Sequence, residues 1–151
     1  MSADEKNMEL MKTLDDAWNS QDWIEIPSKN VMQNDVAIFW PGQPDLTRAV
    51  HNHRKESVEF FKTFPDNHLV NNPYKILFSK DDYTCSVADF SDTFKGPVKG
   101  LDGKIIQPTK EKFHIEFCTI AHWKDEKILE ERLFYDVVGM LAQIGVMPSS
   151  T

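Results

Sequence analysis

Two histidines separated by one residue, His51 and His53, are the first side chains in this sequence that could do chemistry together. In a strand, residues two apart share a face, and two imidazoles on one face could bind a metal ion. Here the pair lies where a loop meets a predicted helix, and the spacing specifies no third ligand. The sequence therefore predicts no metal site.

Considered without His51, His53 has two possible roles. At helical spacing it shares a face with Ser57 and Phe64. It could therefore be a partly buried histidine that is held by hydrogen bonds. Because imidazole titrates near neutral pH, it could instead move a proton. Both interpretations stay open on the sequence.

Acidic and phenolic side chains follow one another further along the chain, as Glu131, Tyr135 and Asp136. Glu131 and Tyr135 fall on one face of a predicted strand, because side chains alternate across a strand. Asp136 stands where this strand stops and a short helix starts, and aspartate is a favoured N-cap residue. It could therefore cap the helix or supply a carboxylate for acid/base chemistry. No phosphate-binding glycine-rich loop, zinc-finger spacing or nucleophile elbow accompanies these residues.

Periodic apolar patterns predict the elements that must position these side chains. Helical spacing indicates helices over residues 4–20 and 54–64, with a short helix or turn over 22–29. A further short helix follows Asp136 and is closed by Gly145. Such an order predicts one α+β domain over residues 1–151, with helices on one side of an antiparallel sheet. Its strands are expected over residues 31–40, 69–78, 83–94, 112–123 and 128–137.

Composition and charge argue against several classes of protein. A net charge of -7 does not suit a nucleic-acid surface, where a basic stripe is expected. No apolar run approaches the ~20 residues that span a bilayer, and the polar first six residues do not look like a signal peptide. Cys85 and Cys118 lie in apolar runs and are expected to be buried free thiols. We therefore expect a cytoplasmic protein that binds neither nucleic acid nor membrane.

A specific pattern lies near the C-terminus, where Asp136, Gly139, Gln143 and Gly145 form the sequence D-x-x-G-x-x-x-Q-h-G. This pattern resembles the ending of the SnoaL-like polyketide cyclases, a branch of the nuclear transport factor 2-like superfamily. The resemblance covers about residues 8–146. It includes the Phe-Pro-Asp helix end at 64–66, the Gly-Pro loop at 96–97 and the Ile-Gln-Pro-Thr run at 106–109.

The resemblance implies a fold and a kind of chemistry. The fold would be a cone-shaped, curved antiparallel sheet whose concave face is covered by the N-terminal helices, which leaves a pocket inside. Cyclases of this family close a polyketide ring by an intramolecular aldol reaction and use neither metal nor cofactor. These folds commonly form homodimers, or tetramers, on the outer sheet face, where Phe134 and Arg132 are expected to point.

The resemblance also places the family's catalytic aspartate at Leu133 and its histidine at Thr119. Leucine has no proton to transfer and a threonine hydroxyl is a poor base, so the family's aldol route is not expected here. If both positions face inward, alternation adds Glu131, Tyr135 and Phe117 to the pocket wall. The outer face would then carry Ile128, Glu130, Arg132 and Phe134, and Leu129 would point inward.

The remaining candidates for proton transfer are Asp136, Glu131, Tyr135 and His53. Burial in an apolar pocket would raise the pKa of Glu131, which suits acid/base work near neutral pH. Glu131 could otherwise be a solvated residue at the pocket rim. Asp136 is the first candidate because it lies at the end of the strand that carries Leu133. Glu131 is the second candidate and His53 is the third. The residues expected to contact a substrate are Trp40, His51, Phe64, Phe117, Thr119, Leu133 and Tyr135.

Two functions follow from this sequence. The first is a cofactor-free enzyme that acts on a small apolar molecule with a carbonyl group or a ring, by isomerisation, cyclisation, dehydration or hydrolysis. The alternative is a non-catalytic protein that holds a hydrophobic ligand in the same pocket, or an assembly module. The absence of the family's two polar residues favours the second function, and Glu131, Tyr135 and the histidines favour the first.

Overall fold

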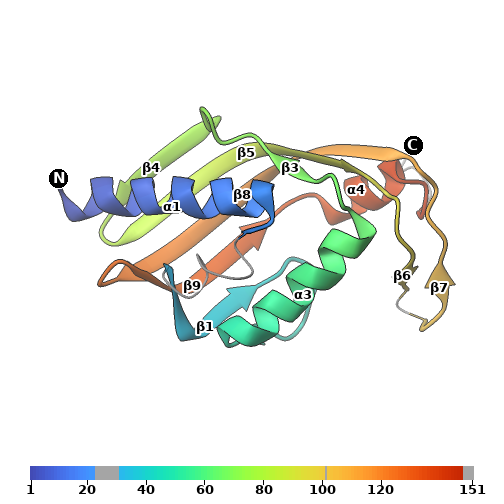
Figure 1. Ribbon diagram of the computed structural model, residues 1–151, viewed down its shortest axis with the longest axis horizontal. Coiled ribbons are helices and arrows are strands. Elements are labelled where there is room, and N and C mark those ends of the chain that lie inside the picture. The colour runs from blue at the N-terminus through green and yellow to red at the C-terminus, as the bar shows by residue number, and fades with distance from the viewer. Residues whose placement is uncertain (23–30, 101, 148–151) are drawn as a thin grey trace.

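Three helices and a curved sheet make up the residues that the computed structural model describes, which are 1–22, 31–100 and 102–147 (Figure 1). The helices are α1 (Ala3–Ser20), α3 (Val50–Thr63) and α4 (Val137–Gln143). The helix or turn predicted over residues 22–29 falls almost wholly outside the described residues. The α+β class is confirmed.

A seven-stranded sheet runs in the order β2-β1-β9-β8-β5-β3, and β4 also pairs with β5. Its long members β5, β8 and β9 are antiparallel neighbours. The sheet is nevertheless mixed, because β1 runs parallel to β9; the prediction of an all-antiparallel sheet was wrong here. The strands are β1 (Met32–Phe39), β2 (Thr47–Arg48), β3 (His68–Leu69), β4 (Ile76–Lys80), β5 (Tyr83–Thr93), β8 (Lys112–Lys124) and β9 (Lys127–Phe134).

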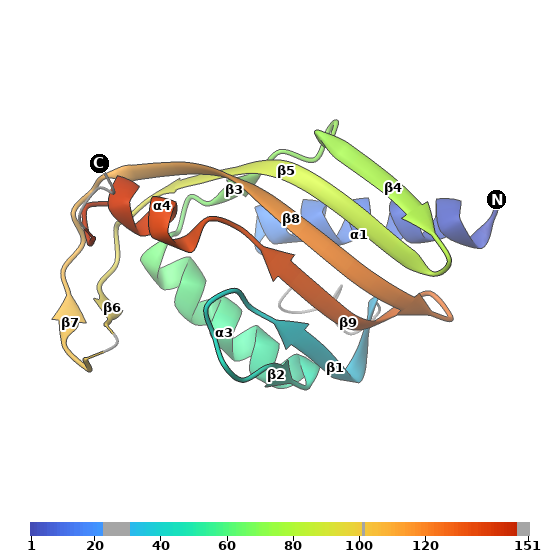
Figure 2. The ribbon, with the colours of Figure 1, turned by 180° about the vertical axis from the view of Figure 1, so that it is seen from behind.

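Helices α1 and α3 lie on the same face of this sheet, in front of the strands in Figure 1 and behind them in Figure 2. A separate hairpin, β6 (Val98–Lys99) with β7 (Ile105–Ile106), extends from one end of the molecule. The strand predicted over residues 69–78 is divided into β3 and β4, which both pair with β5.

Helix α1 begins where its sequence favours a start. The Ser2 hydroxyl accepts a hydrogen bond from the Glu5 backbone N–H, and the Glu5 carboxylate accepts one from the Ser2 backbone N–H, so the pair forms a capping box. Its inward face buries Met11 and Leu14 against the sheet, next to Trp123. This burial anchors α1 over the concave face.

Helix α3 starts four residues earlier than predicted, at Val50. His51 and His53 therefore lie in its first turn rather than in the loop before it. Residues two apart on a helix point in different directions, because each residue turns the helix by about 100°. His51 is exposed and His53 is buried, so the two imidazoles do not face a common ligand.

A β-bulge in the β8–β9 hairpin changes which side chains face inward. Trp123 pairs with Ile128 and His122 pairs with Glu130, which leaves Leu129 as an extra residue. Ile128 is consequently fully buried, whereas simple alternation placed it on the outer face. Beyond the bulge the predicted alternation holds, and Glu131 and Leu133 are both buried.

Two further properties of the described part of the chain bear on the earlier expectations. None of its helices combines the length and the apolar character that crossing a membrane requires. Cys85 and Cys118 are free thiols, as predicted. Both are partly rather than fully buried.

Candidate functional site

A cavity lies between the concave face of the sheet and helices α1, α3 and α4. Most of its wall is apolar, and aromatic rings from α1, α3, β5 and β8 contribute much of that surface. The apolar lining residues are Met11, Leu14, Trp18, Met32, Trp40, Phe60, Leu69, Phe90, Phe117, Leu133 and Met140. The polar ones are Asp15, His53, Thr119, Glu131 and Tyr135.

Glu131 projects from β9 into this cavity and is only 5% exposed. Its carboxyl group receives no hydrogen bond from any residue that the structure describes. Burial, together with the nearby charge of Asp15, raises the pKa of Glu131 to about 8. At neutral pH the side chain is therefore mostly a neutral acid with a proton to donate. The interpretation of Glu131 as a solvated rim residue was wrong.

Asp15 is a second carboxyl group in the cavity wall, and the sequence interpretation missed it. It lies on the inward face of α1, one turn from Met11 and from Trp18. The Tyr74 hydroxyl donates a 2.6 Å hydrogen bond to its Oδ2 atom. Burial raises the pKa of Asp15 to about 7, although the Tyr74 hydrogen bond opposes that rise. A usable signal was present, because an aspartate within the apolar stripe of an amphipathic helix must be buried.

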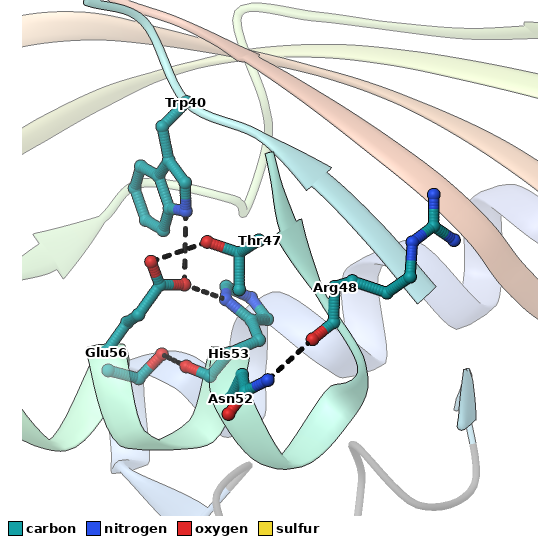
Figure 3. Close-up of polar contacts among 7 residues, drawn as sticks. Trp40, Thr47, Arg48, Asn52, His53 and Glu56 are labelled. Atoms are coloured by element: carbon teal, nitrogen blue, oxygen red, sulfur yellow. Dashed lines mark hydrogen bonds and ion pairs between the residues drawn. The ribbon is translucent and has the colours of Figure 1, made fainter. Parts of the chain in front are cut away.

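His53 reaches the cavity from α3 and is buried. Its Nδ1 atom lies 3.4 Å from Oε1 of Glu56. The same carboxylate accepts hydrogen bonds from Trp40 Nε1 at 3.2 Å and from the Thr47 hydroxyl at 2.6 Å. Figure 3 shows these three side chains gathered around Glu56. Sequence reasoning named His53 and Trp40 but not Glu56 or Thr47.

Burial alone would raise the pKa of Glu56. The hydrogen bonds from His53, Thr47 and Trp40 outweigh that effect and hold its pKa below the usual range, and the positive charge of His53, when it is protonated, acts in the same direction. Glu56 is therefore ionised at neutral pH. Three donors converge on one carboxylate beside the cavity, which fixes the side chains that supply them.

Strands β8 and β9 bring together the remaining predicted wall residues. Thr119 and Leu133 face each other directly across the two strands. The rings of Phe117 and Tyr135 stack with their centroids 5.1 Å apart, and burial raises the pKa of Tyr135. All four side chains line the cavity.

Three predicted residues lie outside the cavity wall. Asp136 is exposed and caps α4, because its Oδ1 atom accepts a 2.8 Å hydrogen bond from the Gly139 backbone N–H. His51 is exposed on α3. Phe64 is buried in the core, with its ring packed against those of Phe94 and Phe113. The structure therefore does not support Asp136 as the acid/base group, nor His51 and Phe64 as substrate contacts.

Proton transfer is the chemistry that this arrangement can perform. Asp15, His53 and Glu131 enter one apolar cavity from three different elements, and two of them titrate near neutral pH. Paired groups of this kind can serve as acid and base in one reaction. Among the described residues, no group of three or more metal-binding side chains is placed to hold an ion.

Comparisons with known proteins agree with this architecture. The family model described as SnoaL-like polyketide cyclase matches residues 8–144. A search of curated proteins found no match. Solved structures that share the fold include a proposed SnoaL-like polyketide cyclase from Jannaschia sp. CCS1, with 18% identity, a TM-score of 0.84 and 98% coverage of both chains.

Two Streptomyces structures are also similar. AclR, a proposed hydroxylase from Streptomyces galilaeus, has 18% identity and a TM-score of 0.79, over 99% of this chain and 87% of AclR. IdmH, a proposed polyketide cyclase from Streptomyces antibioticus, has 20% identity and a TM-score of 0.74, over 93% of this chain and 99% of IdmH. At such identities these likenesses establish the shared fold alone.

Proposed function

This chain belongs to the SnoaL-like polyketide cyclase family, and we propose that it is a cofactor-free enzyme that transfers protons on a small apolar molecule. The molecule would carry a carbonyl group, a ring, or both. Isomerisation, cyclisation and hydrolysis are the reactions that such a site could serve. The family supports small-molecule chemistry, and the cavity of this chain supports the apolar character of the substrate.

The observation that carries the proposal is Glu131, a carboxyl group buried in an apolar cavity with a pKa of about 8. A carbonyl oxygen placed beside it would accept its proton as negative charge develops on that oxygen. A base, either Asp15 or His53, would take a proton from the carbon next to the carbonyl. The product of these two transfers is an enol, from which a double bond can move or a ring can close.

Substitution of Glu131 tests this role. The substrate is unidentified, so the probe is a panel of small cyclic ketones in D₂O, with exchange of the proton next to the carbonyl followed by NMR. We expect Glu131→Gln to slow the exchange by about 10²-fold or more, because the amide cannot donate a proton to the oxygen.

The matched control is Glu130→Gln, which removes a carboxylate from the neighbouring residue of the same strand. Glu130 lies outside the cavity lining, near Arg132 on the other side of the sheet. The control should keep the wild-type exchange rate. Full exchange by the Glu131 variant would contradict the proposal.

A non-catalytic ligand carrier is the second candidate function. The observation that favours it is the pairing of Leu133 with Thr119, the two positions at which the resemblance places the family's catalytic aspartate and histidine. A carrier would bind a ketone of the panel, and it would show no exchange in the wild type. Its affinity would also survive Glu131→Gln.

Dimerisation on the outer sheet face is a further part of the proposal. Ile76, Val87, Cys118 and Phe134 pair successively across four strands and form one row on this face. Phe134 is 52% exposed and Phe78, in the next row, 56%. Exposed apolar area of this kind favours a partner, and we propose a second copy of the chain.

The two free thiols also lie on this face of the sheet. Because they are not paired in a disulfide, they suit a reducing cytoplasm.

Phe134→Glu should convert the dimer to a monomer, because it replaces the exposed aromatic ring of this row with a charge that the interface would bury in each copy. Sedimentation of the wild type should report about twice 17.5 kDa, and the variant should report that mass once. Ile105→Glu is the control, since Ile105 is equally exposed but lies on the β6–β7 hairpin. A wild-type monomer would rule out this interface.

A further inference from the structure

We propose that Glu56 is a positioning residue that holds His53 in one tautomer at the cavity wall, where His53 accepts a proton from the bound molecule. This inference rests on the proposed function, because it assigns to His53 the role of base in that reaction. Glu56 itself does not line the cavity. It acts through His53, with which it shares one face of α3.

The donors around Glu56 leave it no role except that of acceptor. The indole N–H of Trp40 can only donate, and Oε1 of Glu56 receives it. The Thr47 hydroxyl donates to Oε2 at 2.6 Å, a length typical of a bond to an ionised oxygen. The two donors come from different parts of the fold, because Trp40 follows β1 and Thr47 lies in β2.

An ionised Glu56 decides which nitrogen of His53 carries the proton. Oε1 of Glu56 can only accept, so Nδ1 of His53, 3.4 Å away, must be the nitrogen that bears hydrogen. In a neutral imidazole the other nitrogen, Nε2, is then a proton acceptor. The tautomer is thus preset for a base rather than for an acid.

The ring and backbone of His53 are fixed as well. The Ser57 hydroxyl donates a 2.8 Å hydrogen bond to the His53 carbonyl oxygen, one turn along α3. The Trp40 ring lies with its centroid 5.9 Å from that of His53. Trp40 therefore does three things at once: it lines the cavity, packs against His53 and donates to Glu56. A bound molecule that contacts Trp40 would meet a histidine whose orientation is already set.

The first test reads the tautomer directly and needs no substrate. Long-range ¹H–¹⁵N NMR of the histidine rings distinguishes a nitrogen that bears hydrogen from one that does not. We expect wild-type His53 to carry hydrogen on Nδ1 at a pH where it is neutral. Glu56→Gln, which has the same shape but no charge, should move His53 to a mixture of tautomers. Glu59→Gln is the control, because Glu59 lies on the exposed side of the same helix and pairs with Lys62.

The second test measures the ketone exchange described above. Glu56→Gln should lower kcat about tenfold or more and leave KM within about twofold, because it disturbs the base rather than the cavity wall. Thr47→Val should have a smaller effect in the same direction, since Trp40 and His53 still contact Glu56. Both variants should fold, which circular dichroism would check. If Glu56→Gln did not fold, Glu56→Asp would be used instead, because it keeps the charge but shortens the side chain.

The outcomes separate this inference from the proposed function. Hydrogen on Nε2 in the wild type, or a tautomer that ignores Glu56→Gln, would overturn the positioning role whatever the exchange assay gives. Normal exchange by a His53→Gln variant, with exchange still lost in Glu131→Gln, would overturn the role of His53 as base and leave the proposed function intact. No exchange in the wild type, with the predicted tautomer shift, would overturn the function but not the effect of Glu56 on His53.

Discussion

Replacing Glu131 with glutamine is expected to stabilise the fold more at pH 8 than at pH 5. The folded protein holds the Glu131 proton up to a pKa of about 8, whereas an unfolded glutamate releases it near its ordinary value of 4.5. Between these values the unfolded state binds fewer protons, so a rise in pH favours unfolding. The stability linked to this group is fully present below pH 4.5 and is lost as the pH rises to about 8.

The size of the effect follows from the difference between the two pKa values. From pH 5 to pH 8 the wild type should lose about 3 kcal/mol through Glu131 alone, at ~1.4 kcal/mol per unit. Glutamine does not ionise and avoids this loss. The stability difference between variant and wild type should therefore grow by about 3 kcal/mol over the same range. The raised pKa of Asp15 acts in the same direction but is common to both proteins.

Urea unfolding at several pH values between 5 and 8 would measure this difference. Glu130→Gln serves again as the control, and its stability should run parallel to that of the wild type. A Glu131 variant whose advantage is the same at pH 5 and pH 8 would show that Glu131 ionises normally in the folded protein. The acid role proposed for it would then lose its basis.

The predicted gain in stability at pH 8 would mean that Glu131 is kept for a reason other than stability. A buried carboxyl group that receives no hydrogen bond from the described residues lowers stability near neutral pH. Residues of this kind are commonly found where activity requires them, at the expense of stability. A gain in stability together with a loss of ketone exchange in one variant would link the two effects to the same side chain.

Local patterns in the sequence were sufficient for most of the fold. The apolar stripe of α1 and the alternation of β5 and β8 are properties of neighbouring residues, and they predicted those elements closely. The parallel pairing of β1 with β9 joins segments about ninety residues apart, and no local pattern records it. The bulge at Leu129 was missed for a similar reason, since an extra residue shows only when both strands are seen together.

The candidate site shows the same difference between what local sequence patterns predict and what only long-range contacts define. The resemblance placed Thr119 and Leu133 on the cavity wall, and alternation within a single strand then added Glu131. Asp15 was missed although it lies in the apolar stripe of α1, and its partner Tyr74 is 59 residues away. Glu56 was missed because two of the side chains that define its role, Trp40 and Thr47, come from parts of the fold outside its own helix.

The largest loss of stability is expected for Leu133→Asp, which supplies an aspartate where the resemblance places the family's catalytic one. Leu133 is buried, and removal of a buried leucine side chain costs about 2–5 kcal/mol. The new carboxyl group would lie on the same face of β9 as Glu131, in a cavity that already holds Asp15. Like charges in an apolar site raise one another's pKa, so ionisation at pH 8 should cost several kcal/mol more.

Leu133→Asn separates these two costs, because asparagine removes nearly the same volume but has no charge. The two variants should be about equally stable only near pH 3, where an aspartate is protonated in both the folded and the unfolded state. From pH 5 to pH 8 the aspartate variant should lose about 2–3 kcal/mol relative to the asparagine variant, at ~1.4 kcal/mol per unit of pKa shift. Equal stability at both pH values would mean that the cavity solvates a carboxylate well. In that case burial could not keep Glu131 protonated either, and the acid would have to be sought elsewhere in the wall. The predicted divergence would instead show that this cavity solvates a carboxylate poorly, which is the condition that keeps Glu131 protonated.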